Sequence, residues 1–459
     1  MKKMEYPKEL FKAYDIRGVV TTKLTEEVVH DIGMVLGNMA LEAKAEALAV
    51  GCDGRLSSPL LSKALIAGIL KSGCNVFDLG MVTTPMLYFA NYELKTYSGI
   101  MITGSHNPPE YNGLKMVIGG ETLFGEKIQT ILSRLETGNY VQDKSGVCQA
   151  YDITDIYINR IVGDVKLNRQ MSIIIDCGNG VAGKIAPTLY RRMGAKVLGL
   201  FCDVDGNFPN HHPDPSKPEN LEDLIHGLKS TDAEVGLAFD GDGDRLGVVA
   251  KDGNIIYPDR QMMLFAADVL EHNPQAKIIY DVKSSRLLHT WIEENKGEAI
   301  MARTGHSFIK AKIRETGAKL AGEMSGHIFF NDRWSGMDDG VYAGARLLEI
   351  LSRVENVTEL LNALPNAIST PEINIDIPKG DQHAIIAKLQ QSANFPTAKN
   401  IITIDGLRVE YDDGFGLVRA SNTTPVLVLR FESDSKDGLE RIKSEFRNVL
   451  RQNTTKVNF

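Results

Sequence analysis

Short apolar runs that end in polar loops recur along the first three quarters of the chain. Residues 47–50, 173–175 and 278–280 are aliphatic or aromatic, and each run leads into a polar loop and then into a helical pattern. Apolar runs of this length, bounded by turn residues, are typical of buried strands, and a strand–loop–helix succession is typical of an α/β unit. Three such units predict three α/β domains of related design.

The C-terminal part of the chain follows another pattern. Residues 373–377 alternate between apolar and polar side chains, and strand-like runs follow at 407–411, 416–420 and 426–432. This pattern, closed by an amphipathic helix, predicts an α+β domain. The apolar face of that helix is formed by Leu439, Ile442, Phe446 and Leu450.

Length supports a division into several domains. A chain of 459 residues is longer than one hydrophobic core usually organises. The predicted fold class is therefore α/β, with three related α/β domains and a C-terminal α+β domain. The predicted domains cover residues 1–150, 151–254, 255–368 and 369–459.

Charge and composition exclude several functional classes. The net charge is -8 and no basic stripe is present, which argues against nucleic-acid and anionic-membrane binding. The N-terminal lysines precede no apolar segment, and no apolar run has the length of a membrane span. The five cysteines are odd in number and form no CxxC pair, so neither disulfides nor a zinc site are expected. We expect a cytoplasmic protein; the sequence leaves monomer and dimer open.

The first chemical motif is a serine on a tight turn. Residues 103–108 read TGSHNP and follow the apolar run 100–102. Glycine before the serine and Asn-Pro after it predict an exposed turn at the end of a strand. Such a turn presents the Ser105 hydroxyl as a nucleophile or phosphoryl carrier. The alternative is a turn serine that only caps backbone groups.

The second motif is acidic. Residues 240–245 read DGDGDR between two apolar runs, a strand–loop–strand pattern with three carboxylates at alternate positions. The glycines let the loop curl, so that Asp240, Asp242 and Asp244 converge on a hard cation. A calcium EF-hand is excluded, because Arg245 and Lys251 stand where glycine and glutamate are required. An acidic hairpin turn without metal is the simpler alternative.

Two further loops have the composition of ligand-binding sites. Residues 322–327 read GEMSGH, and a glutamate and a serine two positions apart in an extended loop point the same way, which suits vicinal sugar hydroxyls. Residues 419–425 read RASNTTP, where one arginine, several hydroxyls and loop amides suit a phosphate group. This loop lacks the lysine and glycines of a P-loop, so it does not imply a nucleoside triphosphate. A polar loop with an incidental arginine would look the same.

These four motifs in this order, with YDIRG at residues 14–18, resemble the α-D-phosphohexomutase family over nearly the whole chain. The resemblance implies four domains around a central active-site cleft, with the fourth more loosely attached. The GEMSG run and the sequence GNFPNHHP at 206–213 are similar to the phosphomannomutase/phosphoglucomutase branch. The phosphoglucosamine branch usually has glutamine at the position of Met324.

The resemblance also implies cofactors and roles. Mg²⁺ would be held by Asp240, Asp242, Asp244 and an oxygen of phosphorylated Ser105, and glucose 1,6-bisphosphate or mannose 1,6-bisphosphate would act as activator. The expected catalytic residues are Ser105, Arg17, His106, Lys115, Arg245 and His306, with Lys115 and His306 as candidates for the base. The expected substrate-binding residues are Tyr14, Lys283, Glu323, Ser325, His327, Arg419, Ser421, Asn422 and Thr423.

The expected reaction moves phosphate between the 1- and 6-positions of mannose or glucose phosphates through a phosphoserine and a bisphosphorylated sugar. Phosphoglucosamine mutase is the nearest alternative. A metal-dependent sugar phosphatase is a second, although a hydrolase has no need for a separate phosphate-binding loop. A silent sugar-phosphate sensor is a third, although a sensor has no need for the serine and the three carboxylates.

Overall fold

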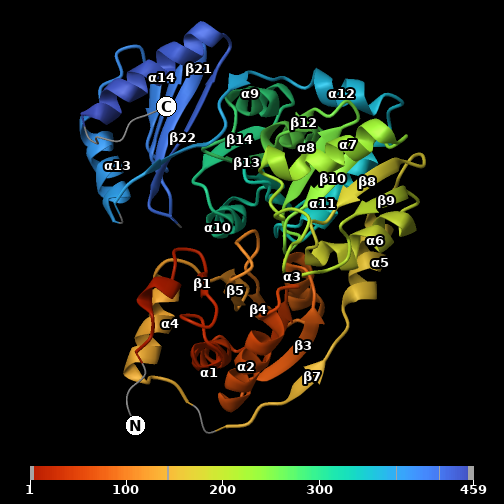
Figure 1. Cartoon of the computed structure of the whole chain (residues 1–459), viewed down its shortest axis with the longest axis vertical. Coiled ribbons are helices and arrows are strands. Elements are labelled where there is room, and N and C mark those ends of the chain that lie inside the picture. The colour runs from red at the N-terminus through yellow and green to blue at the C-terminus, as the bar shows by residue number, and fades with distance from the viewer. Residues whose placement is uncertain (1–4, 142–143, 379, 423, 453–459) are drawn as a thin grey trace. The chain divides into compact units, whose positions relative to one another are not determined.

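The computed structural model describes residues 5–141, 144–378, 380–422 and 424–452. The chain forms two compact units: Met1–Phe265 with Ser325–Ala363, and Ala266–Met324 with Leu364–Phe459. Both consist of β-sheets covered by helices (Figure 1). Among the described residues, no helix is both long enough and apolar enough to span a membrane.

The first unit begins with a mixed sheet. Its strands are β1 (Ile16–Val19), β2 (Ala47–Cys52), β3 (Asn75–Met81), β4 (Gly99–Ile102), β5 (Tyr111–Ile118), β6 (Glu121–Thr122) and β7 (Cys148–Ala150). The helices with them are η1 (Lys8–Leu10), α1 (Glu26–Glu42), α2 (Ser58–Lys71), α3 (Thr84–Glu93) and α4 (Glu126–Thr137). The strand order is β1–β5–β4–β2–β3–β7, with β6 paired to β5. Strand β2 runs parallel to β3 and β4, whereas β5 runs antiparallel to β4 and β1.

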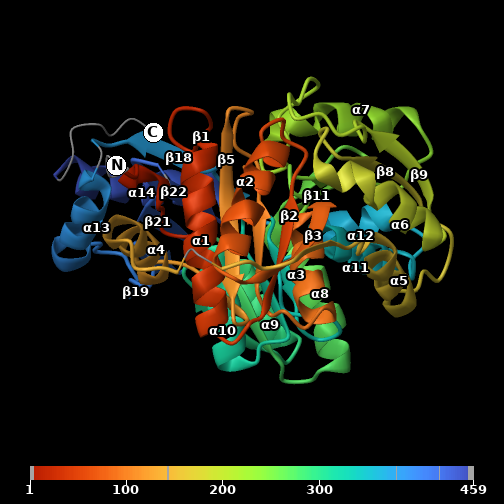
Figure 2. The ribbon, with the colours of Figure 1, turned by 90° about the horizontal axis from the view of Figure 1, so that it is seen from below.

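Alternation along β2 explains why helices cover both faces of this sheet. Leu48 and Val50 belong to a core shared with α1, α2 and α4. Gly51 points the other way, toward Leu87 of α3. Helices α1 and α2 lie side by side (Figure 2). The predicted strand at 47–50 and its following helix are confirmed as β2 and α2.

The second sheet of this unit carries the acidic loop. Its strands are β8 (Ser172–Asp176), β9 (Lys196–Leu200), β10 (Val235–Phe239), β11 (Leu246–Ala250) and β12 (Ile255–Ile256), in the order β12–β11–β10–β8–β9. Strand β8 is parallel to β9 and β10, and β10 is antiparallel to β11. Because Phe239 pairs with Leu246, residues 240–245 form the turn of a hairpin.

The first unit contains further helices and one short strand. They are α5 (Thr154–Asp164), η2 (Val181–Lys184), α6 (Ala186–Arg192), η3 (Pro218–Leu221), α7 (Glu222–Ser230), β16 (Ile328–Phe330), α11 (Gly340–Leu351) and α12 (Val357–Ala363). Helix α11 packs against β10 and β11. The helical pattern predicted after the run at 173–175 begins at Val181 only as the 3-10 turn η2, because Ile185 leaves the helical conformation and a proline opens α6.

The second unit contains a parallel β-sheet and an antiparallel one. The parallel strand β13 (Lys277–Asp281) pairs with β14 (Glu298–Ala302) and β15 (Leu320–Gly322), beside α9 (Arg286–Glu294) and α10 (His306–Thr316). Helix α8 (Pro258–His272) spans the boundary between the two units in the sequence. The run at 278–280 and the helix after it are thus confirmed as β13 and α9.

The antiparallel sheet has the order β17–β22–β21–β20–β19, with β18 paired to β22. Its elements are β17 (Ile368–Ser369), β18 (Ile373–Asp376), α13 (Asp381–Ser392), β19 (Asn400–Ile402), β20 (Leu407–Tyr411), β21 (Gly414–Ala420), β22 (Val426–Ser433) and α14 (Lys436–Arg451). Helices α13 and α14 lie on one face of this sheet (Figure 1). Ile442, Phe446 and Leu450 of α14 are buried against it and Leu439 packs beside them, which confirms the predicted apolar face.

Candidate functional site

Ser105 lies on the loop that follows β4 at the carboxyl end of the strand. Its φ of 48° places it in the left-handed region, where a residue with a side chain is uncommon. The Ser105 amide donates to Thr103 Oγ1 at 2.7 Å, and the Ser105 hydroxyl donates to Asp240 Oδ2 at 2.9 Å. The unusual backbone therefore directs the hydroxyl toward the acidic loop.

Arg55 holds this turn in place, and sequence analysis missed it. Its buried guanidinium donates to the carbonyl oxygens of Ser105 (2.8 Å), Asn107 (2.6 Å), Pro108 (2.6 Å) and Tyr111 (3.0 Å). It is also paired with Asp53, whose carboxylate accepts from the Gly104 amide at 3.1 Å. No local sequence pattern connects an arginine after β2 with a loop fifty residues later.

The acidic loop brings its three carboxylates together in the protein interior. Asp240, Asp242 and Asp244 are fully buried, and an oxygen atom from each lies within 4.8 Å of the others. The Oδ1 atoms of Asp242 and Asp244 accept no hydrogen bond from any described residue. Buried carboxylate oxygens without donors are costly, and they are also the ligands that a hard divalent cation prefers. The loop therefore fits a metal ion.

Lys115 of β5 balances part of this negative charge. Its ammonium lies 2.7 Å from Asp242 Oδ2 and 2.5 Å from Asp244 Oδ2. Although burial opposes its charge, the two carboxylates hold the pKa of Lys115 well above its usual range. Burial also opposes the charge of Asp242, yet Lys115 and the Thr84 hydroxyl, which donates at 2.5 Å, lower the pKa of Asp242. Lys115 is thus an ammonium that donates.

The pKa shifts of Asp240 and His106 both favour the neutral form of the side chain. Burial, followed by repulsion from Asp244 and Asp242, raises the pKa of Asp240 well above its usual range. Burial, followed by the positive charges of Arg245 and Arg17, lowers the pKa of His106 well below its usual range. The neutral imidazole of His106 has Nδ1 3.1 Å from Ser105 Oγ, so it can exchange a proton with that oxygen.

Arg245, His327 and Asp338 are linked in that order behind the acidic loop, by one hydrogen bond and one close ionic contact. Arg245 Nε donates to His327 Nε2 at 3.1 Å, and His327 Nδ1 lies 2.9 Å from Asp338 Oδ2. Because Arg245 can only donate, His327 Nε2 accepts and the ring proton is on Nδ1, facing the carboxylate. Asp338 is fully buried, and sequence analysis missed it. The next residue, Asp339, caps the N-terminus of α11. Two aspartates before a helix are explained by capping alone, so the sequence did not indicate that Asp338 contacts a histidine.

The N-terminal signature contributes through Arg17. Arg17 Nη1 donates to Asn107 Oδ1 in the serine loop, and Arg17 Nη2 pairs with Asp15 at 2.6 Å. Tyr14 lies just before β1 and is half-buried. Ser325 is half-buried in the first unit, in the segment before β16. Of the predicted residues, the first unit thus brings Arg17, His106 and the acidic loop to the serine loop, with Lys115, Arg245 and His327 bound to the acidic loop.

In the second unit, the loops after three parallel strands meet around Asp281. Its carboxylate accepts from the Ser284 hydroxyl (2.9 Å), the Thr304 hydroxyl (3.0 Å) and the Met324 amide (3.2 Å). The Gly305 amide donates to Glu323 Oε1 at 2.5 Å. The carboxyl ends of parallel strands share one edge of a sheet, which is why Lys283, His306 and Glu323 gather there.

Two cationic side chains of this unit, Lys283 and Arg419, are each paired with a carboxylate. Lys283 Nζ lies 2.6 Å from Glu372 Oε1. The positive charge of Lys283 lowers the pKa of Glu372 to about 2, and Glu372 raises the pKa of Lys283 despite its burial. Arg419 Nε lies 3.0 Å from Asp405 Oδ2, which also accepts from the Thr304 amide at 3.0 Å. Lys283 and Arg419 are thus held by carboxylates.

Two further arginines orient the loop of Lys283, and sequence analysis missed both. Arg430 Nη1 donates to the Lys283 carbonyl at 2.7 Å. Arg408 Nη1 donates to the carbonyls of Val282 (2.6 Å) and Ser284 (2.7 Å), and its guanidinium lies 3.7 Å from the centre of the Phe415 ring. Both lie on strands in which apolar and polar residues alternate, and such a pattern does not distinguish a structural arginine from a surface one.

The phosphate-binding loop lies between β21 and β22. Ser421 Oγ and Thr424 Oγ1 lie 2.9 Å apart, and the Thr424 amide donates to Ser421 Oγ at 3.2 Å. Asn422 is in the same loop, next to Thr423, which lies outside the described residues. The turn therefore presents hydroxyl and amide groups beside Arg419.

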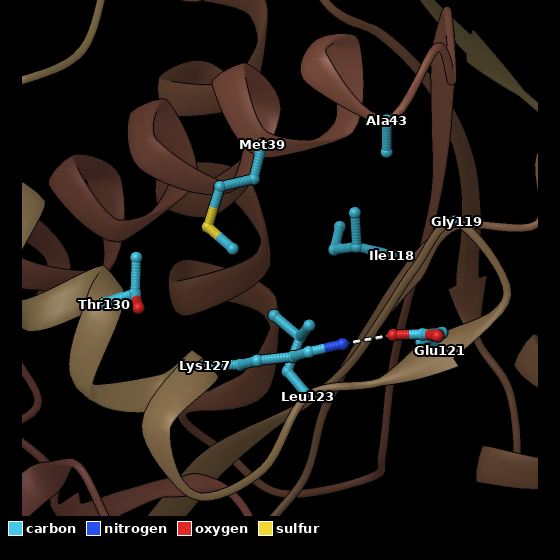
Figure 3. Close-up of a pocket in the computed structure, with 8 residues that line it drawn as sticks. All are labelled: Met39, Ala43, Ile118, Gly119, Glu121, Leu123, Lys127 and Thr130. Atoms are coloured by element: carbon cyan, nitrogen blue, oxygen red, sulfur yellow. Dashed lines mark hydrogen bonds and ion pairs between the residues drawn. The ribbon is translucent and has the colours of Figure 1, made fainter. Parts of the chain in front are cut away.

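A pocket elsewhere in the first unit contains none of the predicted site residues. It lies between α1, the β5–β6 hairpin and α4, and Met39, Ile118 and Leu123 form its apolar wall (Figure 3). An ion pair between Lys127 and Glu121 crosses its rim (Figure 3). Its one lysine is paired with Glu121, and it contains none of the residues of the four motifs, so we assign the function to the serine and acidic loops.

Comparison with known proteins agrees with this assignment. Models of the phosphoglucomutase/phosphomannomutase α/β/α domains I, II and III match residues 8–142, 155–253 and 257–368, and the C-terminal domain model matches residues 372–449. These matches confirm the predicted fold class of three α/β domains and a distinct C-terminal domain.

Individual relatives match along nearly their whole length. The chain is 59% identical over 448 residues to a phosphoglucomutase of Neisseria gonorrhoeae, covering 97% of each protein. It is 54% identical over 446 residues to a phosphomannomutase/phosphoglucomutase of Pseudomonas aeruginosa, covering 97% of the chain and 96% of that protein. A crystal structure of a phosphoglucomutase/phosphomannomutase family protein from Burkholderia thailandensis matches with a TM-score of 0.94, 52% identity and 99% coverage of both chains.

Proposed function

The chain belongs to the phosphoglucomutase/phosphomannomutase family, and from this premise we propose that it is an isomerase acting on glucose and mannose phosphates. It moves phosphate reversibly between the 1- and 6-positions through a phosphorylated Ser105. The observation that carries the proposal is the Ser105 hydroxyl, held 2.9 Å from Asp240 of the buried acidic loop by a strained turn. A serine held this way is suited to accept and donate a phosphoryl group.

The reaction takes place in two transfers. The free hydroxyl of a hexose monophosphate attacks the phosphorus of phosphoserine, the bond from phosphorus to Ser105 Oγ breaks, and a hexose bisphosphate forms. The other phosphate of this intermediate then returns to Ser105 Oγ, which leaves the isomeric monophosphate. Glucose 1,6-bisphosphate or mannose 1,6-bisphosphate activates the enzyme by phosphorylating an unmodified Ser105.

The groups of the acidic loop balance charge during transfer. Mg²⁺ would be held by Asp240, Asp242, Asp244 and an oxygen of phosphorylated Ser105, and when bound it neutralises the transferring phosphoryl group. Lys115 offsets the carboxylates from the other side, and its raised pKa makes it a source of positive charge rather than a base. Arg245, oriented by His327 and Asp338, adds a second fixed positive charge.

Proton movement at the serine is assigned to His106. Its neutral ring, 3.1 Å from Ser105 Oγ, takes the hydroxyl proton when the phosphoryl group arrives at the serine, and the imidazolium so formed returns that proton to Oγ when the phosphoryl group leaves. Arg17 holds the loop that carries both residues, through Asn107. For the proton of the attacking sugar hydroxyl, His306 remains the proposed base.

The second unit supplies groups that bind the substrate. Lys283 and Arg419 would bind the phosphate that is not transferred, exchanging their carboxylate partners for it. The loop residues that assist them are Ser421, Asn422 and Thr423. Glu323 and Ser325 would accept and donate hydrogen bonds with sugar hydroxyls, and Tyr14 and His327 would also contact the substrate.

A coupled assay tests the proposal. The full-length protein is given Mg²⁺ and a trace of glucose 1,6-bisphosphate, and glucose 1-phosphate, mannose 1-phosphate and glucosamine 1-phosphate are compared while inorganic phosphate is monitored. We expect rapid formation of the 6-phosphates of glucose and mannose with little phosphate released. A preference for the glucosamine compound would keep the chemistry and contradict the reading of Met324, whereas phosphate release without isomerisation would identify a phosphatase.

A further inference from the structure

Two cysteine thiols lie next to each other at the carboxyl ends of β8 and β9. These strands are parallel neighbours in which Asp176 pairs with Leu200, so Cys177 and Cys202 leave the sheet at the same edge. Their sulfur atoms are 3.8 Å apart. All five cysteines are free thiols, and within the described part of the chain no other two cysteine sulfurs are within hydrogen-bonding distance. A Cβ at Gly199 would lie 2.7 Å from the Cys202 sulfur, so glycine there leaves room for it.

The two thiols differ in a way that suits oxidation. Cys177 is fully buried, whereas Cys202 is partly exposed. The hydrogen bond between them lowers the pKa of Cys202 and raises that of Cys177 well above its usual range. The accessible sulfur is therefore the one that ionises first, and a thiolate is the form that attacks oxidants and disulfides.

Cys177 also begins a turn that touches the acidic loop. The Cys177 carbonyl accepts from the Gly180 amide at 2.7 Å, and the Val181 amide donates to the Gly241 carbonyl at 3.1 Å. A Cβ at Gly180 would lie only 3.0 Å from the Gly241 backbone, so the turn and the acidic loop are in direct contact. A displacement of Cys177 is therefore passed to the loop of Asp240 and Asp242.

A second connection runs through the residue before Cys177. Asp176 holds His211, whose Nε2 lies 2.9 Å from Asp176 Oδ2. The next residue, His212, contacts the carbonyl of His106 through its Nε2. The backbone of the serine loop thus rests on the same strand end.

We propose that Cys177 and Cys202 form a reversible disulfide that lowers the phosphoryl-transfer activity of the enzyme. A disulfide requires sulfur atoms about 2.05 Å apart, so the two must approach by roughly 1.8 Å from their present separation. The turn at 177–180 must move with them. The effect on activity rests on the proposed function, whereas the formation of the disulfide does not.

Hydrogen peroxide is the oxidant in this scheme. The Cys202 thiolate attacks one peroxide oxygen, the O–O bond breaks, and the departing hydroxide takes a proton to become water. The Cys177 sulfur then attacks the sulfenic acid at Cys202, the S–S bond forms, and a second water leaves with the thiol proton. Two electrons pass from the sulfur atoms to peroxide, and a dithiol reverses the reaction by exchange.

The full-length enzyme is treated with hydrogen peroxide, digested with trypsin without reduction, and examined by mass spectrometry. We expect the peptide 170–184 cross-linked to the peptide that begins at residue 197. Mutase activity should fall by about tenfold to a hundredfold, since displacements near 1 Å at a catalytic site have effects of this size. Dithiothreitol should restore activity.

Three variants separate the proposal from general oxidative damage. Cys202→Ser and Cys177→Ser should keep their activity in peroxide, and Cys148→Ser, which removes an exposed thiol elsewhere, should behave like the parent. If Cys177→Ser fails to fold because the site is buried, the half-exposed Cys202→Ser decides alone. An absent cross-link, a cross-link without loss of activity, or an equal loss in Cys202→Ser would overturn the proposal.

Binding of Mn²⁺ followed by electron paramagnetic resonance keeps the two proposals distinguishable. If the reduced protein shows no mutase activity, the proposed function fails. The cross-linked peptide and a weaker affinity for Mn²⁺ after oxidation would still support the disulfide and its link to the acidic loop. An unchanged affinity in the cross-linked protein would show that the link to the loop is absent.

Discussion

The acidic loop of the first unit and the cationic loops of the second unit both bury several charged side chains, but they balance them differently. Around Asp240, Asp242 and Asp244 the nearby positive charges are Lys115 and Arg245, and two carboxylate oxygens remain without a donor among the described residues. In the second unit, Lys283 and Arg419 each have a carboxylate partner.

This difference in charge balance indicates which kind of ion each region is suited to bind. Buried charge is tolerated when it is paired, so an unbalanced acidic cluster attracts a cation. Carboxylates paired with Lys283 and Arg419 keep these cations charged and oriented, and in the proposed function a phosphate of the substrate takes their place. Carbonyl groups assist in the second unit, where Arg408 and Arg430 fix the backbone of residues 282–284. These features agree with the proposed function, which assigns metal-assisted transfer to the first region and phosphate binding to the second.

The largest expected effect comes from removing the Ser105 hydroxyl, which lies beside the acidic loop. Ser105→Ala should lower mutase turnover by at least about a thousandfold, because the phosphoryl carrier is lost. Substrate binding, measured by calorimetry, should change little, since the second unit is untouched. Ser133→Ala on the exposed face of α4 is the matched control. Turnover near the parent value in Ser105→Ala would refute the role of this residue.

The next effect tests whether the acidic loop depends on its internal cation. Lys115→Met leaves three carboxylates without their closest positive charge, so the free energy of unfolding should fall by about 3 kcal/mol. Added Mg²⁺ should recover part of this loss, because a bound cation replaces the ammonium. Thermal unfolding with and without Mg²⁺ measures both quantities.

Lys63→Met on the exposed side of α2 serves as the control for this experiment. If Mg²⁺ stabilised Lys115→Met no more than the parent enzyme, the ammonium and the metal would not be balancing the same carboxylates. The acidic loop would then not be the cation-seeking region that distinguishes the first unit from the second.

The third effect addresses the second region. Arg419→Ala should raise the KM for glucose 1-phosphate by about tenfold and lower kcat less, since in the proposed function the arginine binds the phosphate that does not react. Arg451→Ala, on an exposed position of α14, is the control. A fall in kcat with an unchanged KM would place Arg419 in the transfer step and remove the distinction between the regions.

These two regions were not equally visible in the sequence. The serine and acidic loops are short, local patterns after buried strands, so Ser105 and the three aspartates were predictable from glycine spacing and neighbouring apolar runs. The convergence of Lys283, His306 and Glu323 follows from parallel strands, but only the resemblance to a family gave those residues roles. The fold class was predictable for the same reason, since strand and helix periodicities are local.

The residues that were missed act through distant contacts. Arg55 donates hydrogen bonds to a loop fifty residues away, and Asp338 contacts His327, which accepts a hydrogen bond from Arg245. Arg430 and Arg408 lie on strands whose alternation predicts only that they face one side. A positioning role depends on which backbone carbonyl or side chain the tertiary fold brings near, and no single-sequence pattern records that pairing.

The smallest expected effect concerns Asp176 and His211, a matched ion pair in the first unit that contrasts with the unbalanced acidic loop. Burial alone would lower the pKa of His211, but hydrogen bonding and the charge of Asp176 raise it overall. The stabilising effect is therefore complete below the unfolded pKa of about 6.5 and is lost as the pH rises through the higher folded value. His211→Gln should thus destabilise the protein by about 1 kcal/mol near pH 6 and by less near pH 9.

Chemical unfolding of the parent and His211→Gln at these two pH values measures the difference, with the exposed His226→Gln on α7 as control. A pH-independent loss would mean that His211 contributes packing and not charge, because only an interaction of the protonated ring disappears on titration. The Asp176–His211 contact would then differ from the contacts of Lys115 and Arg245 with the acidic loop, where both partners carry charge. The strand end that carries Cys177 would in that case keep its connection to the serine loop through the uncharged contact of His212 Nε2 with the His106 carbonyl.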